Sequence, residues 1–349
     1  MVRRTAVDGP RNRPFALLVL ACVGAASPAA AASCDAAAGL SPCFDANSLW
    51  LPAGRATFFS LPDTRVIASG QVGFGAAIEE LHRPVLLHAS SPDLGDRDIH
   101  VVDNAVDTSF FLAFGLSRGL ELELAAPMRA YQTGAGEGSV TSQSGPPVPR
   151  NAVRNPRVAL AYSLDDALQT RALGLRVSLE AALPTGDAGA FASEQSFVAA
   201  PSVTVSWHPA PLTVTAGFGA RLRSPVEFGA VRLGNQGFAA VGVALELFTP
   251  GVLALSLEAF GLPPLSASRA AAAPLRVSDE LLFPAEWSAG VHSAFGTSGP
   301  WTVSLALGSG LPLSSETERG SNGSTTRRFS GMGTPQVRSL LVLRFSPPQ

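Results

Sequence analysis

The stretch L-G-L-R-V-S-L-E-A-A-L, residues 173–183, decides the fold class of this chain. Leucine and Val177 alternate there with Gly174, Arg176, Ser178 and Glu180. Successive side chains of a β-strand point to opposite faces, so the alternation predicts a strand with one apolar face and one small, polar or charged face. Strands of roughly 9 to 11 residues are long enough to cross a bilayer at a tilt.

Other segments along the chain repeat this pattern, and together they predict an all-β protein. We expect about twelve antiparallel strands in a single up-and-down transmembrane β-barrel. The expected strands cover residues 66–80, 104–115, 118–127, 154–164, 172–183, 200–208, 211–222, 237–248, 251–262, 284–296, 300–311 and 335–346.

The composition also favours a barrel. Charged residues make up 15% of the chain, whereas they make up about 25% of ordinary soluble domains. No run approaches the ~18 apolar residues of a spanning helix, and in lipid only helices and closed barrels satisfy every backbone polar group. A soluble β-sandwich would alternate too, but its strands average ~5 to 6 residues. With a net charge of −2 and no basic run, the chain shows no nucleic-acid signal.

The connections between the expected strands alternate in length. Outer-membrane barrels have short periplasmic turns and longer outer loops. With an even strand count, both ends of the barrel are then expected in the periplasm. Short turns are expected at residues 116–117, 165–171, 209–210, 249–250 and 297–299, and long loops at 81–103, 128–153, 184–199, 223–236, 263–283 and 312–334.

Aromatic residues occur near the expected strand ends, where barrels carry girdles at the membrane interfaces. Trp287 is expected in the outer girdle, and the others are expected on the periplasmic side. Phe345 is also expected to replace the terminal aromatic residue that the barrel-assembly machinery reads. The expected girdle residues are Phe114, Trp207, Phe248, Trp287, Phe295, Trp301 and Phe345.

The N-terminus has the features of a secretory signal peptide, residues 1–32, with arginines, a short apolar stretch and a small-residue cleavage site. Residues 33–62 are expected to form a periplasmic N-terminal segment or a plug for the mouth of the barrel. Within it, Cys34 and Cys43 are expected to form a disulfide in the oxidising periplasm. The barrel is expected to cover residues 63–346, with a tail at 347–349.

The inward positions of the expected strands decide the function. Small residues such as Gly217, Gly242 and Gly290 leave room for water, and charged residues lie between them. One interpretation is a polar lumen whose charges control the passage of small solutes; the other is a salt-bridge network that closes and rigidifies the barrel. The expected lumen-facing charges are Glu79, Glu121, Glu123, Arg157, Arg176, Glu180, Arg221, Glu246, Glu258, Glu286, Arg338 and Arg344.

Catalytic signals are weak. Residues 115–119 match G-x-S-x-G, but a nucleophile elbow requires a strand-to-helix turn, and here the motif lies between two expected strands. A lipid-face hydrolase would use Ser117 or Ser206 with His292, yet Ser206 and His292 are expected to face inward. We expect no enzymatic activity, no catalytic residue, no metal site and no cofactor.

Short motifs resemble those of transporter-like barrels linked to phenol-degradation pathways (MetA-type), and of the N-terminal barrel of some OmpA-family proteins. The resemblance implies an outer-membrane location, passive transport of small solutes, and contacts with membrane lipid. A structural or surface-interaction barrel with a closed lumen is the alternative. The residues that carry the resemblance are Asn155 to Arg157, Ala182 to Asp187, Gly217 to Arg223 and Gly333 to Pro335.

Overall fold

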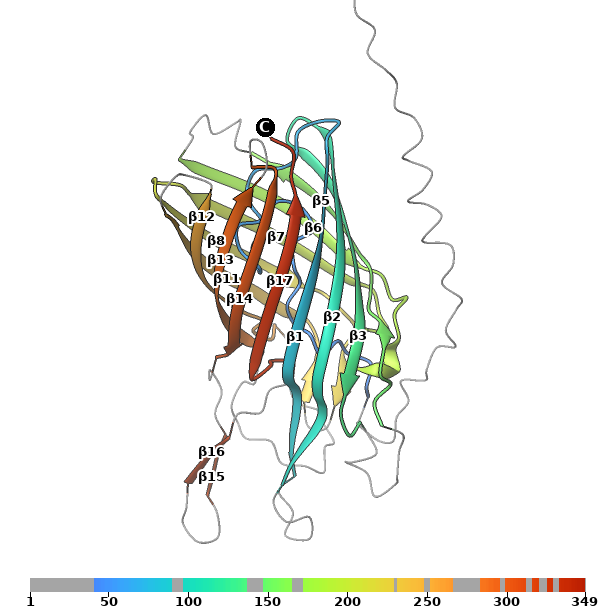
Figure 1. The fold of residues 1–349 in the computed structure, drawn as a ribbon. Coiled ribbons are helices and arrows are strands. Elements are labelled where there is room, and N and C mark those ends of the chain that lie inside the picture. The colour runs from blue at the N-terminus through green and yellow to red at the C-terminus, as the bar shows by residue number, and fades with distance from the viewer. Residues whose placement is uncertain are drawn as a thin grey trace, which may run out of the picture. The chain divides into compact units, whose positions relative to one another are not determined.

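The computed structural model describes residues 41–89, 97–136, 147–164, 172–228, 231–247, 252–265, 283–295, 299–311, 316–319, 325–328 and 333–348. Twelve long strands form one closed antiparallel barrel (Figure 1). Each strand pairs with the next one along the chain, and β1 closes the ring by pairing with β17. The twelve strands are β1 (Val72–Ala89), β2 (Arg97–Ser117), β3 (Leu120–Thr133), β5 (Arg157–Ser163), β6 (Leu173–Ala182), β7 (Val198–Trp207), β8 (Leu212–Arg221), β11 (Gln236–Leu247), β12 (Leu253–Gly261), β13 (Ala285–Phe295), β14 (Trp301–Gly310) and β17 (Val337–Phe345).

The connections between these strands contain short secondary-structure elements. Two-residue β4 (Ala152–Val153) pairs with β3, and a 3₁₀ turn covers Ala188–Ala190. Within the described residues, no helix is long and apolar enough to cross a membrane. Two small hairpins consist of β9 (Val226–Phe228) with β10 (Val231–Leu233), and of β15 (Glu316–Arg319) with β16 (Thr325–Arg328).

All twelve predicted strands are confirmed, but the predicted loop at 81–103 is wrong over most of its length. There β1 continues to Ala89, and β2 already begins at Arg97. The alternation breaks because Arg83 adopts a positive φ of 52° and the register shifts between His82 and Val85, as at a β-bulge. Pairing resumes beyond the bulge, so the hairpin is longer than the sequence pattern indicates.

The two ends of the barrel differ in their connections. The tight turns between β2 and β3 and between β7 and β8 lie at the short-turn end. Residues 183–197, 222–228 and 231–235 lie at the opposite, long-loop end, as do the ends of β1 and β2 that pair near Ala89 and Arg97. Gly119 in the first tight turn has a φ of +77°, and an added Cβ would lie 2.9 Å from the carbonyl oxygen of Ser163. The predicted turns at 165–171 and 249–250 lie outside the described residues.

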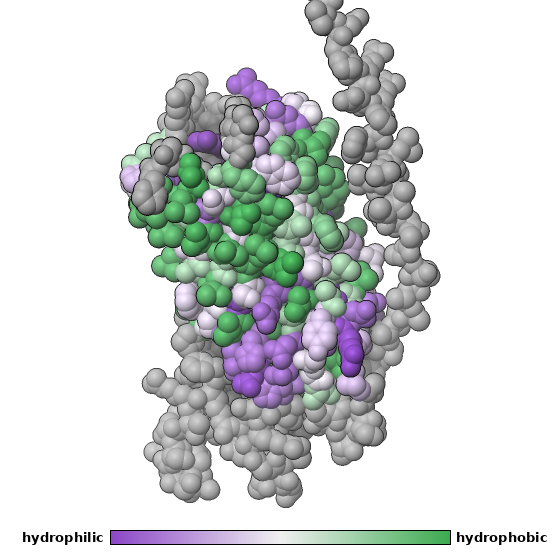
Figure 2. All heavy atoms as spheres, viewed as in Figure 1, coloured by the Kyte–Doolittle hydropathy of each residue, from purple (hydrophilic) through white to green (hydrophobic). Residues whose placement is uncertain are grey.

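The outer surface of the barrel is apolar. Large side chains such as Leu179, Phe110 and Leu307 point outward and are 56%, 59% and 63% exposed. Figure 2 shows apolar side chains covering the wall on one face, with a hydrophilic band toward the long-loop end. Exposed apolar surface on this scale is stable in contact with lipid, whereas in water it would favour association.

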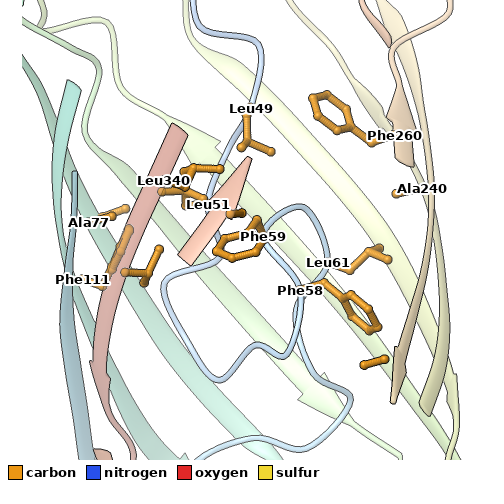
Figure 3. Close-up of a cluster of buried hydrophobic side chains, with 14 of the residues drawn as sticks. Leu49, Leu51, Phe58, Phe59, Leu61, Ala77, Phe111, Ala240, Phe260 and Leu340 are labelled. Atoms are coloured by element: carbon orange, nitrogen blue, oxygen red, sulfur yellow. The ribbon is translucent and has the colours of Figure 1, made fainter. Parts of the chain in front are cut away.

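The chain before β1, residues 41–67, runs through the inside of the barrel, and we call it the inner segment (Figure 3). Near the long-loop end, the Ala46 N–H donates to the carbonyl oxygen of Phe191. Just beyond the other end of the segment, the Gly70 N–H donates to the carbonyl oxygen of Gly115 at the short-turn end. Cys43 therefore lies near the long-loop end. Strand parity alone predicts the opposite end, because it takes no account of a chain that passes through the lumen before the first strand.

Apolar side chains of the inner segment form two clusters with the wall. Figure 3 shows the central cluster, in which the inner segment contributes Leu49, Leu51, Phe58, Phe59 and Leu61. At the long-loop end, Phe44 packs edge-on against Phe191 and Phe228, and its ring centroid lies 5.4 and 5.3 Å from theirs. The core of this barrel is thus formed between the wall and the segment that it encloses.

Candidate functional site: the barrel interior

One cluster of buried charges lies toward the long-loop end. Asp107 of β2 accepts a hydrogen bond from Arg129 Nε at 2.7 Å and lies 3.1 Å from Arg154 Nη1. Arg154 Nη2 lies 2.7 Å from Asp45 Oδ2 of the inner segment. Burial by itself lowers the pKa of Arg154, but Asp45 and Asp107 outweigh it and raise the pKa overall, so the guanidinium stays charged. The cluster ties the inner segment to the wall, and none of its members is among the predicted lumen residues.

Arg338 of β17 makes a second attachment. Its Nε and Nη2 donate to the two carboxylate oxygens of Glu286, at 2.7 and 2.9 Å, and its Nη1 pairs with Glu79. The same Nη1 donates to Asn47 Oδ1 of the inner segment at 3.0 Å. Ser48 Oγ donates to Glu286 at 2.9 Å. Two neighbouring residues of the inner segment therefore complete a charge group on the wall.

A ladder of charges lines β3, β5 and β6. Arg176, which is 1% exposed, pairs with Glu123 and lies 3.6 Å from Glu121. Arg157 Nη1 donates to Glu180 Oε1 at 2.8 Å. Each arginine of the ladder is therefore paired with a glutamate of the wall itself.

Two arginines lie against aromatic rings instead. The Arg221 guanidinium lies 4.3 Å from the ring centroid of Trp50, and that of Arg344 lies 5.5 Å from Phe111. Arg344 Nη2 also donates to the carbonyl oxygen of Pro52 at 2.8 Å. Among the described residues, neither arginine has a carboxylate oxygen within ion-pair distance. Dipoles and ring faces are their direct partners, and more distant carboxylates, such as Glu180 for Arg221 and Asp63 for Arg344, attract them without contact.

Glu258 holds the middle of the inner segment. Its carboxylate accepts hydrogen bonds from the N–H groups of Phe59 and Ser60, at 2.9 and 3.0 Å, and from Ser288 Oγ at 2.9 Å. Glu246 is half-buried near the short-turn end. The structure places every predicted lumen charge on a barrel strand with its side chain buried or half-buried.

Glycines of the wall receive bulky side chains of the inner segment. Real Cβ atoms essentially never approach another heavy atom to less than 3.0 Å, and an alanine at these positions would do so. The inward glycines therefore hold apolar side chains of the inner segment, where the sequence predicts room for water. Three such pairs are Phe58 on Gly242, Phe59 on Gly290 and Leu61 on Gly217, for which the added Cβ would lie 2.6, 2.7 and 2.4 Å away.

Two spaces remain beside the inner segment in the described part of the barrel. The vestibule, of about 680 Å³, lies at the short-turn end and is bordered by Arg55, Arg344 and His292. The inner cavity, of about 70 Å³, lies between Trp50 and the wall formed by β6, β7 and β8. Because each water in a cavity needs roughly 10 to 15 Å³ of space, the inner cavity has room for about five waters or one small solute.

His292 of β13 forms a polar bridge across three strands. Its Nε2 lies 2.6 Å from Ser256 Oγ of β12, and its Nδ1 lies 2.8 Å from Ser304 Oγ of β14. The ring centroid of Phe59 lies 5.3 Å from the imidazole. The three strands are fully paired at this point, and the bridge links them to the inner segment.

The G-x-S-x-G motif lies in the tight turn between β2 and β3. Strand β2 ends at Ser117 and β3 begins at Leu120, so a strand and not a helix follows the serine. Ser206, the other candidate nucleophile, shares a 2.8 Å hydrogen bond with Thr215 inside the barrel. Neither serine has the surroundings of a nucleophile elbow.

Aromatic side chains gather on the outer wall at the short-turn end. Trp301 packs edge-on against Phe74 and Phe345, with centroids 5.6 and 5.1 Å apart, and stacks with Phe295 at 6.4 Å. Phe74 completes this group although it is not among the predicted girdle residues. Of the remaining predicted residues, Phe114, Trp207 and Trp287 are exposed, and Phe248 lies outside the described residues.

The predicted disulfide and signal peptide stay predictions, because Cys34 and residues 1–32 lie outside the described residues. Cys43 is buried, at 1% exposed. In the part of the chain that the structure describes, no group of three or more histidine, cysteine, aspartate or glutamate side chains could hold a metal ion.

Solved structures match the chain, although no protein-family model and no curated protein does. An outer membrane channel from Pseudomonas putida F1 is 14% identical, and the match covers 81% of this chain and 97% of that one with a TM-score of 0.52. The KdgM porin, solved in complex with disordered oligogalacturonate, is 6% identical, with coverages of 79% and 99% and a TM-score of 0.44. The toluene transporter TbuX of Ralstonia pickettii is 10% identical, with coverages of 80% and 90% and a TM-score of 0.35. The first match shows that this chain has the fold of an outer-membrane β-barrel.

Proposed function

We propose that this chain, with the fold of an outer-membrane barrel, is a passive channel for small solutes whose lumen is closed by the inner segment. The observation that carries the proposal is that the wall and the inner segment supply different side chains to the barrel interior. The wall supplies glycines, hydroxyls, charges and some apolar side chains, and the inner segment supplies Phe58, Phe59 and Leu61, which fill the space over the wall glycines. A filling that belongs to a separate segment can leave without unfolding the wall.

Barrel size supports this interpretation. The interior of an eight-stranded barrel is filled by its own side chains, whereas barrels of sixteen to eighteen strands leave an aqueous channel. A twelve-stranded wall lies between these cases and needs additional material to be closed. Without the inner segment, the interior would be lined by charged and small polar residues together with a few apolar side chains such as Phe111 and Leu340. Charged and polar side chains of this kind line solute channels.

The way in which the inner segment is held also supports a removable closure. The β-bridge between Asp45 and Ala192 is isolated, and the other attachments of the described inner segment are largely side-chain hydrogen bonds, ion pairs and apolar contacts. Water and small ions can replace such polar contacts one at a time. A full strand ladder would have to break cooperatively.

A structural barrel that stays closed is the second candidate. The bidentate contact between Arg338 and Glu286 favours it, since a fully buried charge pair is costly to break. The two candidates differ in a measurable way, because a channel must open often enough to conduct and a structural barrel must not. We further propose that the protein is not an enzyme, in line with the hairpin position of Ser117.

The test uses the purified full-length protein. In planar bilayers it should give ion conductance, and in liposomes it should let small polar solutes enter while larger sugars stay outside. Protein-free liposomes and liposomes with heat-unfolded protein serve as controls. The channel proposal would be refuted if neither conductance nor solute entry exceeded these controls while gels showed a folded barrel.

A further inference from the structure

Arg221 borders the inner cavity as a buried cation, and no carboxylate oxygen of the described residues lies within ion-pair distance of it. The side chain is 7% exposed, its Nη1 donates to the carbonyl oxygen of Ser48 at 2.8 Å, and its guanidinium lies over Trp50. The other charges around the cavity are matched, since Arg176 pairs with Glu123 and Glu180 pairs with an arginine of β5. Among the described residues of the lining, Arg221 is therefore the charge without a direct ion pair, and only more distant carboxylates, Glu180 and Glu194, attract it.

An unpaired buried charge is costly, because the desolvation of the ion is not repaid by a nearby counter-charge. A carboxylate bound in the cavity would supply that counter-charge. Guanidinium and carboxylate also match in shape, because both are planar and can form two parallel hydrogen bonds. Arg221 uses one nitrogen for Ser48, so other N–H groups remain for a ligand.

The rest of the cavity restricts the size and polarity of such a ligand. Ser178 and Ser202 present hydroxyl groups 2.8 Å apart, and Thr204 adds a third hydroxyl. Pro52 and Phe238 provide apolar surface. Room for about five waters corresponds to a solute of roughly five to seven non-hydrogen atoms. A hydroxyl next to a carboxylate would use both kinds of polar group.

We propose that the inner cavity binds small organic monocarboxylates, in particular hydroxy acids, with the carboxylate on Arg221 and the hydroxyl on the serine pair. The inference rests on the proposed channel function and names a solute class for it. An anion bound there would lie beside the inner segment, at a binding site within the lumen.

Binding to the solubilised full-length barrel tests the inference directly. Isothermal titration calorimetry with lactate is compared with lactamide, which has the same size but no charge. Lactate should bind, and lactamide should bind at least about tenfold more weakly, because a hydrogen bond to a charged group contributes more than a neutral one. Equal binding of the two, or no binding of lactate, would overturn the inference.

Two substitutions locate the site. Arg221→Gln should weaken lactate binding by about tenfold or more, and Arg221→Lys should retain part of it. Arg150→Gln is the matched control, because it removes one positive charge from an exposed side chain away from the cavity and should leave binding unchanged. Lactate binding that is equal in all three variants would contradict the assignment. If Arg221→Gln does not fold, the comparison of lactate with lactamide on the unmodified protein still decides.

The inference and the channel proposal can fail separately. A barrel that binds lactate selectively but conducts nothing contradicts the channel and leaves the binding site standing. A barrel that conducts and admits neutral solutes, but does not prefer lactate to lactamide, contradicts the binding site and leaves the channel standing.

Discussion

Filling one wall glycine should loosen the closure of the lumen. In Gly242→Val, the new Cβ would lie 2.6 Å from two carbons of the Phe58 ring, which is too close for any real structure. β-Branched residues such as valine are favourable in strands. Because β11 is paired on both sides, we expect the wall to stay in place. The Phe58 side chain, which is 2% exposed, would have to move instead.

The size of the effect follows from overpacking. Extra methyl groups in a well-packed core cost about 1 to 3 kcal/mol, and each 1.4 kcal/mol changes an equilibrium about tenfold. The ratio of open to closed barrels should therefore rise roughly 5- to 150-fold. Single-channel recording in planar bilayers measures the open probability, from which this ratio follows.

Two further variants make the result specific. Gly261→Ala is the matched control, because its Cβ would lie at least 3.4 Å from its neighbours and none of these belongs to the inner segment. In the double variant Phe58→Ala/Gly242→Val, the clash is absent and the effects should be non-additive. Unchanged open probability in Gly242→Val, or strictly additive effects of the two substitutions, would refute the seating of Phe58 in the wall.

Three other substitutions test separate parts of the structure. Arg338→Met should destabilise the folded barrel by about 3 to 5 kcal/mol, because it leaves the Glu79 and Glu286 carboxylates buried and unpaired. The urea concentration at which half of the heat-modifiable gel band is lost measures this change. An unchanged midpoint would count against the charge group. Trp301→Ala should cost about 0.5 to 1.5 kcal/mol for each lost aromatic pair, and it should slow insertion into lipid vesicles; insertion at the normal rate would argue against a girdle role. His292→Leu should cost about 1 to 3 kcal/mol, because Ser256 and Ser304 lose their partner; urea unfolding checks it, and a stability equal to that of the unmodified protein would mean that the bridge contributes nothing.

The strands could be predicted because alternation is a local property of the sequence. Residues 173–183 show it without interruption, and the structure has β6 at Leu173–Ala182. The extension of β1 beyond His82 could not be predicted, since the bulge at Arg83 disturbs the local period while pairing with β2 continues.

The arrangement of the interior depends on contacts between distant residues. Inward glycines such as Gly242 are visible in the sequence as small residues, but only the path of the inner segment shows that Phe58 fills the space. Asp45 precedes the first expected strand. Arg154 begins the expected strand at 154–164, but it lies three residues before the inward Arg157, so a period of two places it on the outer face. Asp107 does lie on an expected strand, and its position in the period of two predicts that its side chain faces inward.

Removing the inner segment tests the central claim most directly. The full-length protein and a variant that lacks residues 41–67 are compared for conductance in planar bilayers and for solute entry into liposomes. We predict brief or small conductance for the full-length protein, and large, steady conductance with faster solute entry for the shortened variant. Equal conductance of the two, or a folded shortened barrel that conducts nothing, would contradict a channel that is closed by this segment.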